Sequence, residues 1–290
     1  MENLNPLLSV LMTSFNREQY IAEAIESVLA STYTNFELLI VDDGSKDRTV
    51  EIARSYAGTD PRIHVYINEQ NLGDYRNRNQ AASYAKGEFI MYVDSDDKIL
   101  VDGFERCIAA MNQFPQAGFG MQYIETGKSP FLLSSKLAIQ QHFFKEPCLM
   151  IGPGGTILRR SFFEKIGRYP VKYGPANDMY FNLKAAAAGP ILMLPFTFNY
   201  YRIHEGQELN NKYSYLYNNF NYLRDALQEL DLPLTDKEKT WLMNKNRRRF
   251  LVNFLNYCVR SRDLSKAFAA KKLAGFSIKD AWRALVHPSL

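Results

Sequence analysis

Residues 36–45 read Phe-Glu-Leu-Leu-Ile-Val-Asp-Asp-Gly-Ser, an apolar run that ends in two carboxylates and a turn. A short apolar run bounded by turn residues predicts a buried strand. We expect Ser45 to cap a following helix that runs to Ala57. This stretch therefore predicts a strand, a turn and a helix, with Asp42 and Asp43 at the carboxyl end of the strand.

The same alternation of strand and helix continues on both sides of this stretch. Further strands are predicted at residues 7–12, 63–67 and 88–93, and helices at 21–29, opened by Asn16 and Gln19, and at 74–86, closed by Gly87. Alternating elements with short connections predict an α/β fold with a mixed, mainly parallel sheet and helices on both faces. The strands end at polar residues: Thr13-Ser14, Asp42-Asp43, Asn68 and Asp94 to Asp96. Because ligands bind beyond the carboxyl ends of such strands, we expect one crevice there.

The pattern loosens after about residue 115 and changes after about residue 206. Strands are predicted at 119–124 and at 191–201, the latter interrupted by Pro195, and a helix at 177–188, while residues 151–158 contain Gly152, Gly154 and Gly155. Beyond that the signals are helical and basic. We therefore expect a first domain over residues 1–205 and a helical C-terminal extension over residues 206–290.

Composition excludes several classes of protein. The 290 residues are 46% hydrophobic and 13% aromatic, which disordered and collagen-like chains are not. No run approaches 18 apolar residues, so no transmembrane helix is expected, and the acidic start lacks a signal-peptide layout, which predicts a cytoplasmic chain. Cys107, Cys148 and Cys258 lie too far apart for a zinc motif and are expected to be inert thiols.

Charge is distributed unevenly. Residues 210–290 hold 15 basic and 7 acidic side chains, against 20 and 24 in residues 1–209. In the extension, basic and apolar residues interleave: Lys245, Arg247, Arg248, Arg249, Arg260 and Arg262 with Trp241, Leu242, Phe250, Leu251, Phe254 and Leu255. One prediction from this pattern is a basic amphipathic helix that lies on an anionic membrane surface and attaches the chain peripherally to the inner face of the membrane. The alternative is a helix that packs its apolar side on the first domain and leaves its charges solvated. No nucleic-acid-binding motif accompanies the charge.

The carboxylates after the fourth strand are candidate metal ligands. Asp94 and Asp96 stand two apart, and such residues point the same way from an extended chain. Hard ions such as Mg²⁺ or Mn²⁺ prefer carboxylate oxygens and share them with substrate phosphates. The alternative is a solvated acidic turn that caps the next helix. The chain has no Walker loop and no Gly-x-Gly-x-x-Gly after its first strand, so a glycine cradle for phosphate is disfavoured.

Four motifs in order resemble the family-2 glycosyltransferases. They are residues 9–16, residues 41–47, Arg78-Asn79 with residues 85–90, and Asp94-Ser95-Asp96-Asp97. The resemblance covers about residues 7–205. It implies a GT-A fold and an inverting transfer of a sugar from a nucleotide sugar, most commonly a UDP-sugar, to a glycan or lipid-linked glycan of the cell envelope.

The resemblance also assigns roles to residues. It implies donor binding by Thr13, Phe15, Asp43, Arg78, Asp94, Ser95 and Asp96, a Mn²⁺ or Mg²⁺ ion on Asp96 and His204, an acceptor side at Gly154, Gly155 and Thr156, and Asp178 as the catalytic base. The chain departs from the family at Phe15, where tyrosine is common, and at Asn177, where glutamate is usual. For Asp178 we expect the dipole of the helix that it opens to lower the pKa.

Two other functions compete with this interpretation. A nucleotidyltransferase shares the alternation and the carboxylates, but usually has a Gly-rich basic loop after its first strand, which is missing after Thr13. A non-catalytic carbohydrate-binding protein on a transferase scaffold is the second alternative. The joint presence of Asp43, Asp96, Asp178 and His204 argues against such decay.

Overall fold

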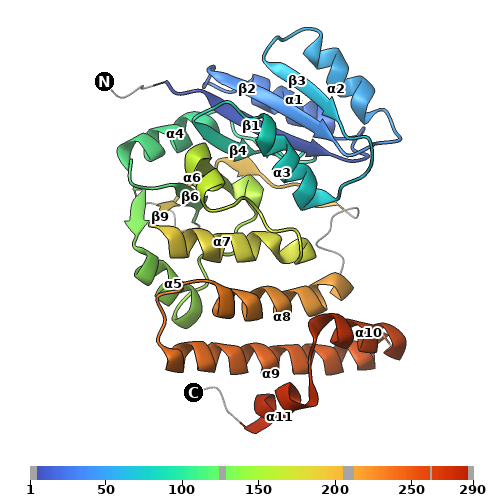
Figure 1. Cartoon of the computed structure of the whole chain (residues 1–290). Coiled ribbons are helices and arrows are strands. Elements are labelled where there is room, and N and C mark those ends of the chain that lie inside the picture. Colours follow the sequence, from blue (N-terminus) through green and yellow to red (C-terminus); the bar gives the residue numbers. More distant parts are fainter. Residues whose placement is uncertain (1–4, 124–128, 205–211, 262, 287–290) are drawn as a thin grey trace.

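The computed structural model describes residues 5–123, 129–204, 212–261 and 263–286. A twisted sheet with helices on both faces forms one part of the molecule, and the C-terminal helices stack beneath it (Figure 1). Among the described residues no helix has the length and apolar content to cross a membrane. The predicted boundary between residues 205 and 206 falls outside the described residues.

The sheet has eight strands in the order β3-β2-β1-β4-β8-β6-β9-β7. Their bounds are β1 Leu8–Ser14, β2 Phe36–Asp42, β3 Ile63–Ile67, β4 Phe89–Tyr92, β6 Phe119–Gln122, β7 Phe131–Leu133, β8 Thr156–Arg159 and β9 Ile191–Leu194. The first four strands of that order are parallel, while β8 and β7 run antiparallel to their neighbours. The register pairs Ser14 with Asp42, so the polar ends of β1 and β2 lie side by side. A two-stranded ribbon joins β5 (Lys98–Ile99) and β10 (Asn199–Tyr200).

Helices cover both faces, as the alternation predicts. One apolar core joins the sheet to α1 (Ile21–Leu29), α2 (Thr49–Ala57) and α4 (Gly103–Gln113). The other joins it to α3 (Asp74–Tyr84), α5 (Ser135–Phe144), α6 (Arg160–Lys165) and α7 (Asn177–Ala188). The first helices of the extension, α8 (Lys212–Glu229) and α9 (Asp236–Ser261), add Tyr222, Leu227 and Leu242 to this second core. The extension is therefore packed onto the sheet domain, on the α7 side.

Several predicted helix ends were wrong. Asn16 does not cap α1: it has a positive φ of 53°, and its side chain accepts a hydrogen bond from the amide of Lys46 (2.9 Å). Ser45 does not cap α2, because its hydroxyl donates to Asp42 (2.5 Å) and the helix begins only at Thr49. The Ser45 hydroxyl also accepts a hydrogen bond from the amide of Asn16 (2.8 Å), so bonds between these two loops replace the local caps that sequence spacing indicates. The strand predicted at 191–201 is divided: β9 ends at Leu194, before Pro195, and β10 begins only at Asn199.

Gly87 lies between α3 and β4 and does not close the helix, which ends at Tyr84. A Cβ on Gly87 would stand 2.6 Å from both the carbonyl oxygen of Leu7 and the amide nitrogen of Ser9. Both atoms belong to the backbone at the start of β1, which cannot move without disturbing the sheet. Gly87 is therefore needed for close approach between two chain segments.

We expect Gly87→Ala to lower the free energy of unfolding by about 1–3 kcal/mol, since overpacking against backbone forces a shift of the strand. Gly58→Ala is the matched control, because Gly58 has an ordinary helical φ of −69° and its new Cβ would meet its nearest neighbour at 3.5 Å. The control should be neutral or stabilising by a few tenths of a kcal/mol, roughly the loss of unfolded-state entropy. Urea unfolding monitored by circular dichroism compares the two; equal stability would refute the role given to Gly87.

Candidate active site

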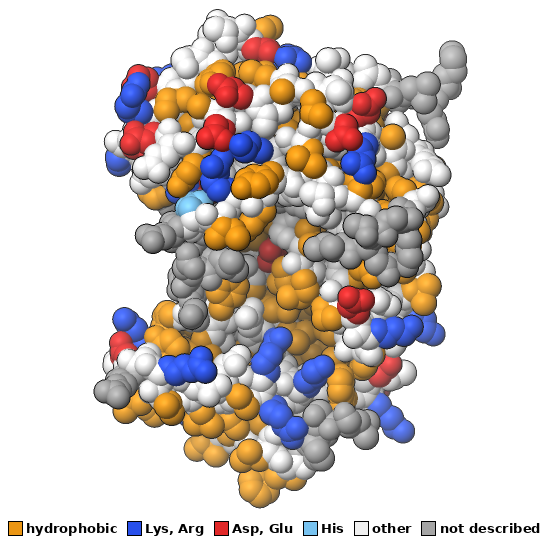
Figure 2. Space-filling view, turned by 180° about the vertical axis from the view of Figure 1, so that it is seen from behind, with side chains coloured by type: hydrophobic (Ala, Val, Ile, Leu, Met, Phe, Trp, Pro, Cys, Tyr) orange, Lys and Arg blue, Asp and Glu red, His pale blue; other side chains and the backbone are white. Residues whose placement is uncertain are grey.

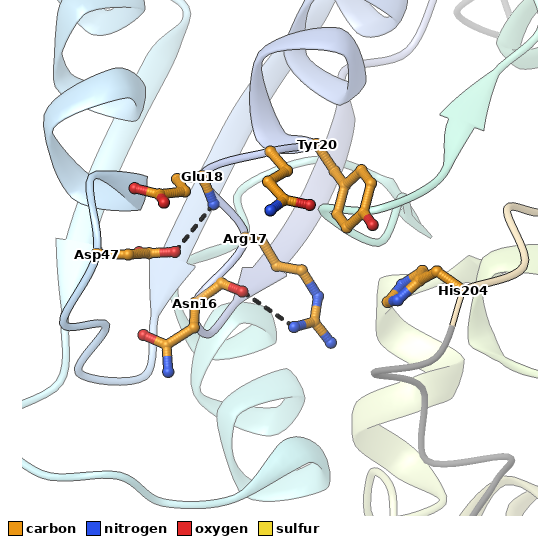
Figure 3. Close-up of a pocket in the computed structure, with 7 residues that line it drawn as sticks. Asn16, Arg17, Glu18, Tyr20, Asp47 and His204 are labelled. Atoms are coloured by element: carbon orange, nitrogen blue, oxygen red, sulfur yellow. Dashed lines mark hydrogen bonds between the residues drawn. The ribbon is translucent and has the colours of Figure 1, made fainter.

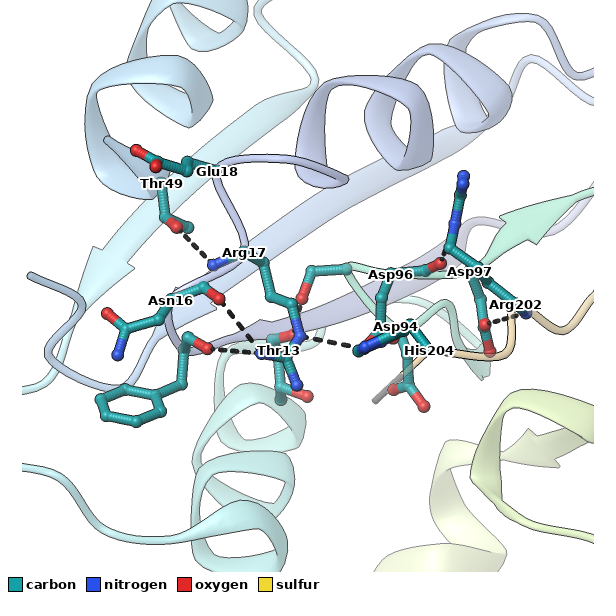
Figure 4. A network of polar contacts seen from close by, with 12 residues as sticks. Thr13, Asn16, Arg17, Glu18, Thr49, Asp94, Asp96, Asp97, Arg202 and His204 are labelled. Carbon is teal, nitrogen blue, oxygen red and sulfur yellow. Dashed lines mark hydrogen bonds and ion pairs between the residues drawn. The ribbon is translucent and has the colours of Figure 1, made fainter. Parts of the chain in front are cut away.

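Three segments far apart in the sequence meet at the carboxyl edge of the parallel strands (Figure 4). They are the loop that follows β1, the turn of residues 94–97 after β4, and residues 201–204 after β10. The sequence predicts the first two as neighbours because parallel strands share an edge. The third joins them through the contacts described next.

Asp96 is the meeting point of these segments. Its Oδ2 atom accepts a hydrogen bond from Arg17 Nε at 2.9 Å and lies 3.0 Å from His204 Nε2. The side chains of Asp96 and His204 are only 14% and 12% exposed, and the ring of Tyr20 packs on that of His204 with centroids 4.8 Å apart. The structure thus brings together the two residues predicted as metal ligands. Arg17 was not predicted as a site residue, because no spacing rule connects it to a residue 79 positions away.

Asp97 and Arg202 hold the late segment in place. The amide of Arg202 donates to Asp97 Oδ1 (2.8 Å), and its guanidinium donates to the carbonyl of Asp96 (2.9 Å) and to Glu23 (2.9 Å). These bonds fix residue 202 on the turn, so His204 reaches Asp96. Burial raises the pKa of the Asp97 carboxyl to about 7. Neither residue was predicted as a site residue, although Asp97 belongs to the quoted Asp94-Ser95-Asp96-Asp97 motif.

Arg78 is buried between two carboxylates. It lies 2.6 Å from Asp94 Oδ1 and 2.8 Å from Asp74 Oδ1, and its guanidinium stands over the ring of Tyr92. Burial alone would lower the pKa of Arg78, but the two carboxylates hold it well above its usual range. Arg78 is therefore not a solvated charge on the surface of α3. Asp94 is tied to α3 through this cation.

Ser95 and Asp43 make bonds inside the protein. Ser95 is buried, and its hydroxyl donates to the carbonyl of Thr13 (2.8 Å), which joins the ends of β4 and β1. Asp43 accepts from the amides of Leu72 (2.8 Å) and Gly73 (2.9 Å), with a further bond from Asn68. Its carboxylate thereby shapes the loop that precedes α3. The side chain of Phe15, in contrast, is 43% exposed beside this edge.

Asp178 stands in the first turn of α7, where the sequence places it. Its Oδ1 accepts a hydrogen bond from the amide of Met179 (2.7 Å), and its Oδ2 faces Gly152, where an added Cβ would stand 3.6 Å away. Burial raises the pKa of Asp178 to about 7, against the favourable pull of that amide and of Arg78. The predicted lowering by the helix dipole was therefore wrong, because desolvation outweighs it. A carboxylate poised near neutral pH has the pKa expected of a general base.

The predicted acceptor-side residues form a turn beside Asp178. Gly154 and Gly155 belong to the short helix η1 (Pro153–Gly155), and Thr156 begins β8. The Thr156 hydroxyl is buried and donates to the carbonyl of Pro153 (2.8 Å). It is therefore the backbone of this turn, and Gly152 above all, that borders the carboxylate. Gly152 was not among the predicted residues. Asn177, the family departure, caps the preceding turn through Tyr173 and Gly174.

A pocket of about 240 Å³ opens next to the Asp96 contact (Figure 3). It is lined by Asn16, Arg17, Glu18, Gln19, Tyr20, Asp47 and His204. Figure 3 shows the Arg17 guanidinium between Asn16 and His204. On the face seen in Figure 2, a hollow separates the sheet domain from the C-terminal helices, with an acidic side chain on its floor and Lys and Arg side chains along the helices below.

The donor set at Asp96 fits a divalent ion in its chemistry. The Asp96 carboxylate is the ligand type that suits Mn²⁺ and Mg²⁺, and its Oδ2 atom lies 3.0 Å from an imidazole nitrogen, a ligand of divalent transition metals. Within the described part of the chain no three His, Cys, Asp or Glu side chains cluster as a metal site. Phosphate oxygens of a substrate would therefore have to supply further ligands, as they do in many Mg²⁺ sites.

Comparison with known proteins settles the family. Residues 9–167, more than half of the chain, match the model of glycosyl transferase family 2. The chain belongs to this family. It is 41% identical over 105 residues to the UDP-Glc:alpha-D-GlcNAc-diphosphoundecaprenol beta-1,3-glucosyltransferase WfgD of Escherichia coli, which covers 36% of the chain and 41% of the relative. It is 39% identical over 94 residues to the glycosyltransferase GlyG of Streptococcus pneumoniae, covering 32% and 31%. The chain thus spans less than half the length of the curated relatives that it matches.

Solved structures confirm the GT-A fold and the mainly parallel sheet. The chain superposes on S. aureus TarS in complex with UDP-GlcNAc with a TM-score of 0.70 at 22% identity, over 91% of this chain and 79% of that one. It superposes on the mannosyltransferase PcManGT of Pyrobaculum calidifontis, in complex with GDP-Man and Mn²⁺, with a TM-score of 0.62 at 14% identity, over 97% and 88%. Both alignments extend beyond the family match, so the fold likeness includes C-terminal helices.

The raised pKa of Asp178 predicts a pH-dependent stability. The folded chain binds this proton more tightly than the unfolded chain, so stability falls by about 1.4 kcal/mol per pH unit between the two pKa values, near 4 and 7, and is flat above. Asp178→Asn removes this loss. Between pH 4.5 and pH 8, the free energy of unfolding of the variant should therefore rise by about 2–4 kcal/mol relative to that of the parent.

Chemical denaturation at several pH values measures this gain. Asp102→Asn is the control, because the Asp102 side chain is 47% exposed and contacts Arg106 only at 3.5 Å. A difference between Asp178→Asn and parent that stays constant with pH would show that the carboxyl titrates in its ordinary range.

Proposed function

We propose that this chain is an inverting glycosyltransferase that moves a sugar from a nucleotide diphosphate sugar to a hydroxyl of a glycan or lipid-linked glycan. The observation that carries the proposal is the Asp96–His204 contact, which places a carboxylate and an imidazole beside a pocket at the carboxyl edge of the sheet. The names of relatives support the substrate class: WfgD is named for UDP-Glc, and TarS is solved with UDP-GlcNAc. A UDP-sugar is accordingly the proposed donor.

The donor lies across the ends of β1, β2 and β4 in this proposal. Phe15 offers an exposed ring for the nucleobase, and Thr13 and Asp43 would lie beside it at the ends of β1 and β2. Arg78 binds Asp94, and Ser95 bonds to the carbonyl of Thr13. These two contacts hold the turn that carries Asp96. Arg17 provides a guanidinium at the pocket, where it would face the negative charge of a diphosphate.

Asp96 and His204 would hold the Mn²⁺ or Mg²⁺ ion. When bound, such an ion neutralises the charge that develops on the leaving diphosphate. The chain itself positions the two ligands. The bonds of Arg202 to Asp97 and to the carbonyl of Asp96 hold His204 beside Asp96, and the Tyr20 ring packs on the imidazole. PcManGT, solved with Mn²⁺, supports this assignment by fold likeness alone.

Asp178 would act as the general base. Above pH 7 its carboxylate is ionised, and it takes the proton from the acceptor hydroxyl while that oxygen forms its bond to the anomeric carbon. The bond from that carbon to the diphosphate oxygen breaks on the opposite face, and the configuration inverts. The backbone of Gly154 and Gly155, with Thr156 behind it, forms the acceptor side. Residues 1–205 would carry the chemistry, and residues 206–290 would form the extension.

Asp178→Asn tests the base directly. The amide keeps the shape and the hydrogen bond from Met179 but cannot accept the proton, so turnover should fall by at least about 10²-fold. Donor affinity, measured by calorimetry with the nucleotide diphosphate, should stay within a factor of about 3 of the parent, since Asp178 is not assigned to the donor. Asp102→Asn serves again as the control. Parental turnover in Asp178→Asn would remove it from the mechanism.

The metal assignment is tested by Mn²⁺ binding in the presence of UDP, followed by electron paramagnetic resonance. Asp96→Asn and His204→Ala should each weaken Mn²⁺ binding by at least about 10-fold, in the range seen when metal-site partners are lost. His64→Ala, at a half-buried histidine on β3, should have no effect. Unchanged Mn²⁺ affinity in both site variants, or full activity in excess chelator, would contradict the assignment.

A screen of UDP- and GDP-sugars separates the proposed activity from its alternatives. Release of nucleotide diphosphate with Mn²⁺ identifies a glycosyltransferase, while release of pyrophosphate from a nucleoside triphosphate and sugar phosphate identifies a nucleotidyltransferase. Sugar binding with no turnover of any donor identifies a carbohydrate-binding protein on a transferase scaffold. The family match favours the first outcome.

A further inference from the structure

The last helix of the described chain, α11 (Ile278–Val286), exposes its apolar face. Ala284 is buried and Ala281 packs against the neighbouring helices, so the small residues make the internal contact. Ile278, Trp282 and Leu285 follow one another at the spacing of a single helix face and are 83%, 66% and 68% exposed. An ordinary surface helix shows the reverse arrangement, with its large apolar residues inside.

The C-terminal half of α9 extends this exposed surface. Val252, Leu255 and Val259 also share one helix face and are all exposed. Together with Ile278, Trp282 and Leu285 of α11, which packs on α9, they form what we call the apolar edge: Val252, Leu255, Val259, Ile278, Trp282 and Leu285. Leu264 and Phe268 of α10 (Leu264–Ala274) are exposed as well. In Figure 2, hydrophobic side chains gather along the lower margin of the molecule, where Figure 1 places α9 and α11.

Positive charge borders the apolar edge. Residues 245–286 contain eleven Lys and Arg and only two Asp and Glu. Both acids are engaged within the extension: Asp280 binds Arg247 (2.8 Å), and Asp263 caps α10 at the amide of Lys266 (2.9 Å). Figure 2 shows Lys and Arg side chains along the helices just above the hydrophobic margin. The partner of this surface must therefore be apolar and negatively charged together.

We propose that the apolar edge docks on an anionic lipid bilayer. Apolar side chains entering the boundary of the acyl chains, ringed by lysines and arginines at the headgroups, are the interfacial mode of membrane binding. Trp282 suits this boundary because its ring is apolar and its N–H is polar. A second copy of the chain fits poorly, because pairing two such edges brings two strongly positive surfaces together.

This surface differs from the one that the sequence indicates. The predicted membrane face is the middle of α9, with Leu242, Phe250 and Phe254. Leu242 and Phe250 are buried, however, and the ring of Phe254 packs on those of Phe250 and Phe268. Leu242 packs on the first domain, as the alternative predicts, whereas Phe250 and Phe254 pack against other helices of the extension and Leu255 is exposed. Arg262 of the predicted set lies outside the described residues. The proposal goes beyond the transferase activity and does not depend on it.

Flotation with liposomes of phosphatidylcholine, with and without 30% phosphatidylglycerol, tests the proposal with the full chain. The parent should float with the anionic vesicles at low salt, less at high salt, and at least tenfold less with neutral vesicles. Trp282→Glu should reduce flotation at least tenfold, and Lys272→Glu combined with Lys279→Glu should remove the preference for anionic vesicles. Val101→Glu, at a 56% exposed valine of the sheet domain, is the matched control and should float like the parent.

Two further measurements complete the experiment. Circular dichroism and thermal unfolding confirm that each variant is folded, and release of nucleotide from the donor in solution should be the same in the parent and the variants. Absence of flotation in the parent, or equal flotation of Trp282→Glu and Val101→Glu, overturns the proposal. So does a dimer in analytical ultracentrifugation that Trp282→Glu dissociates, because the edge would then be covered by a second copy.

Discussion

The turn of residues 94–97 is the point on which the site depends. Each of its carboxylates holds a different part of the chain: Asp94 binds Arg78 of α3, Asp96 binds Arg17 and His204, and Asp97 binds the amide at residue 202. Clustered carboxylates repel one another, and the arrangement is stable because cations and amides stand between them. The same bonds bring the β1 loop, α3 and the late segment to one edge of the sheet.

Burial separates the roles of the acidic residues. Asp97 and Asp178 both have their pKa raised to about 7 because they are largely removed from water. The Asp97 carboxylate accepts a hydrogen bond from the amide of Arg202, in the segment of residues 201–204, and is therefore a positioning residue. Asp178 faces the glycine turn, with one oxygen directed at Gly152, and so remains available for a proton. Two carboxyls with similar pKa values thus serve different purposes through what their oxygens touch.

The sequence predicts the regular elements of the sheet domain well. The spans of β3 and α7 match the prediction residue for residue, because hydrophobic periodicity and turn residues are local signals. Contacts between loops were not predictable in the same way. Asn16 and Ser45 have the positions of helix caps, yet each bonds to the other's loop, and Arg17 reaches Asp96 only once the strands are aligned. The sign of the pKa shift at Asp178 depends on what covers it, which no spacing reveals.

The shared core of α7, α8 and α9 has a consequence for how this fold can be divided. Tyr222, Leu227 and Leu242 complete the apolar layer that covers one face of the sheet. Removing them would leave that layer open to water, at a cost of about 1.5–3 kcal/mol for each large side chain exposed. In a hybrid protein that exchanges C-terminal helices between relatives, the junction would therefore have to follow α8. The residue at the position of Leu242 in the new α9 would also have to fit the apolar core of the sheet domain. The smallest transferable unit of this chain is larger than the segment that defines its family.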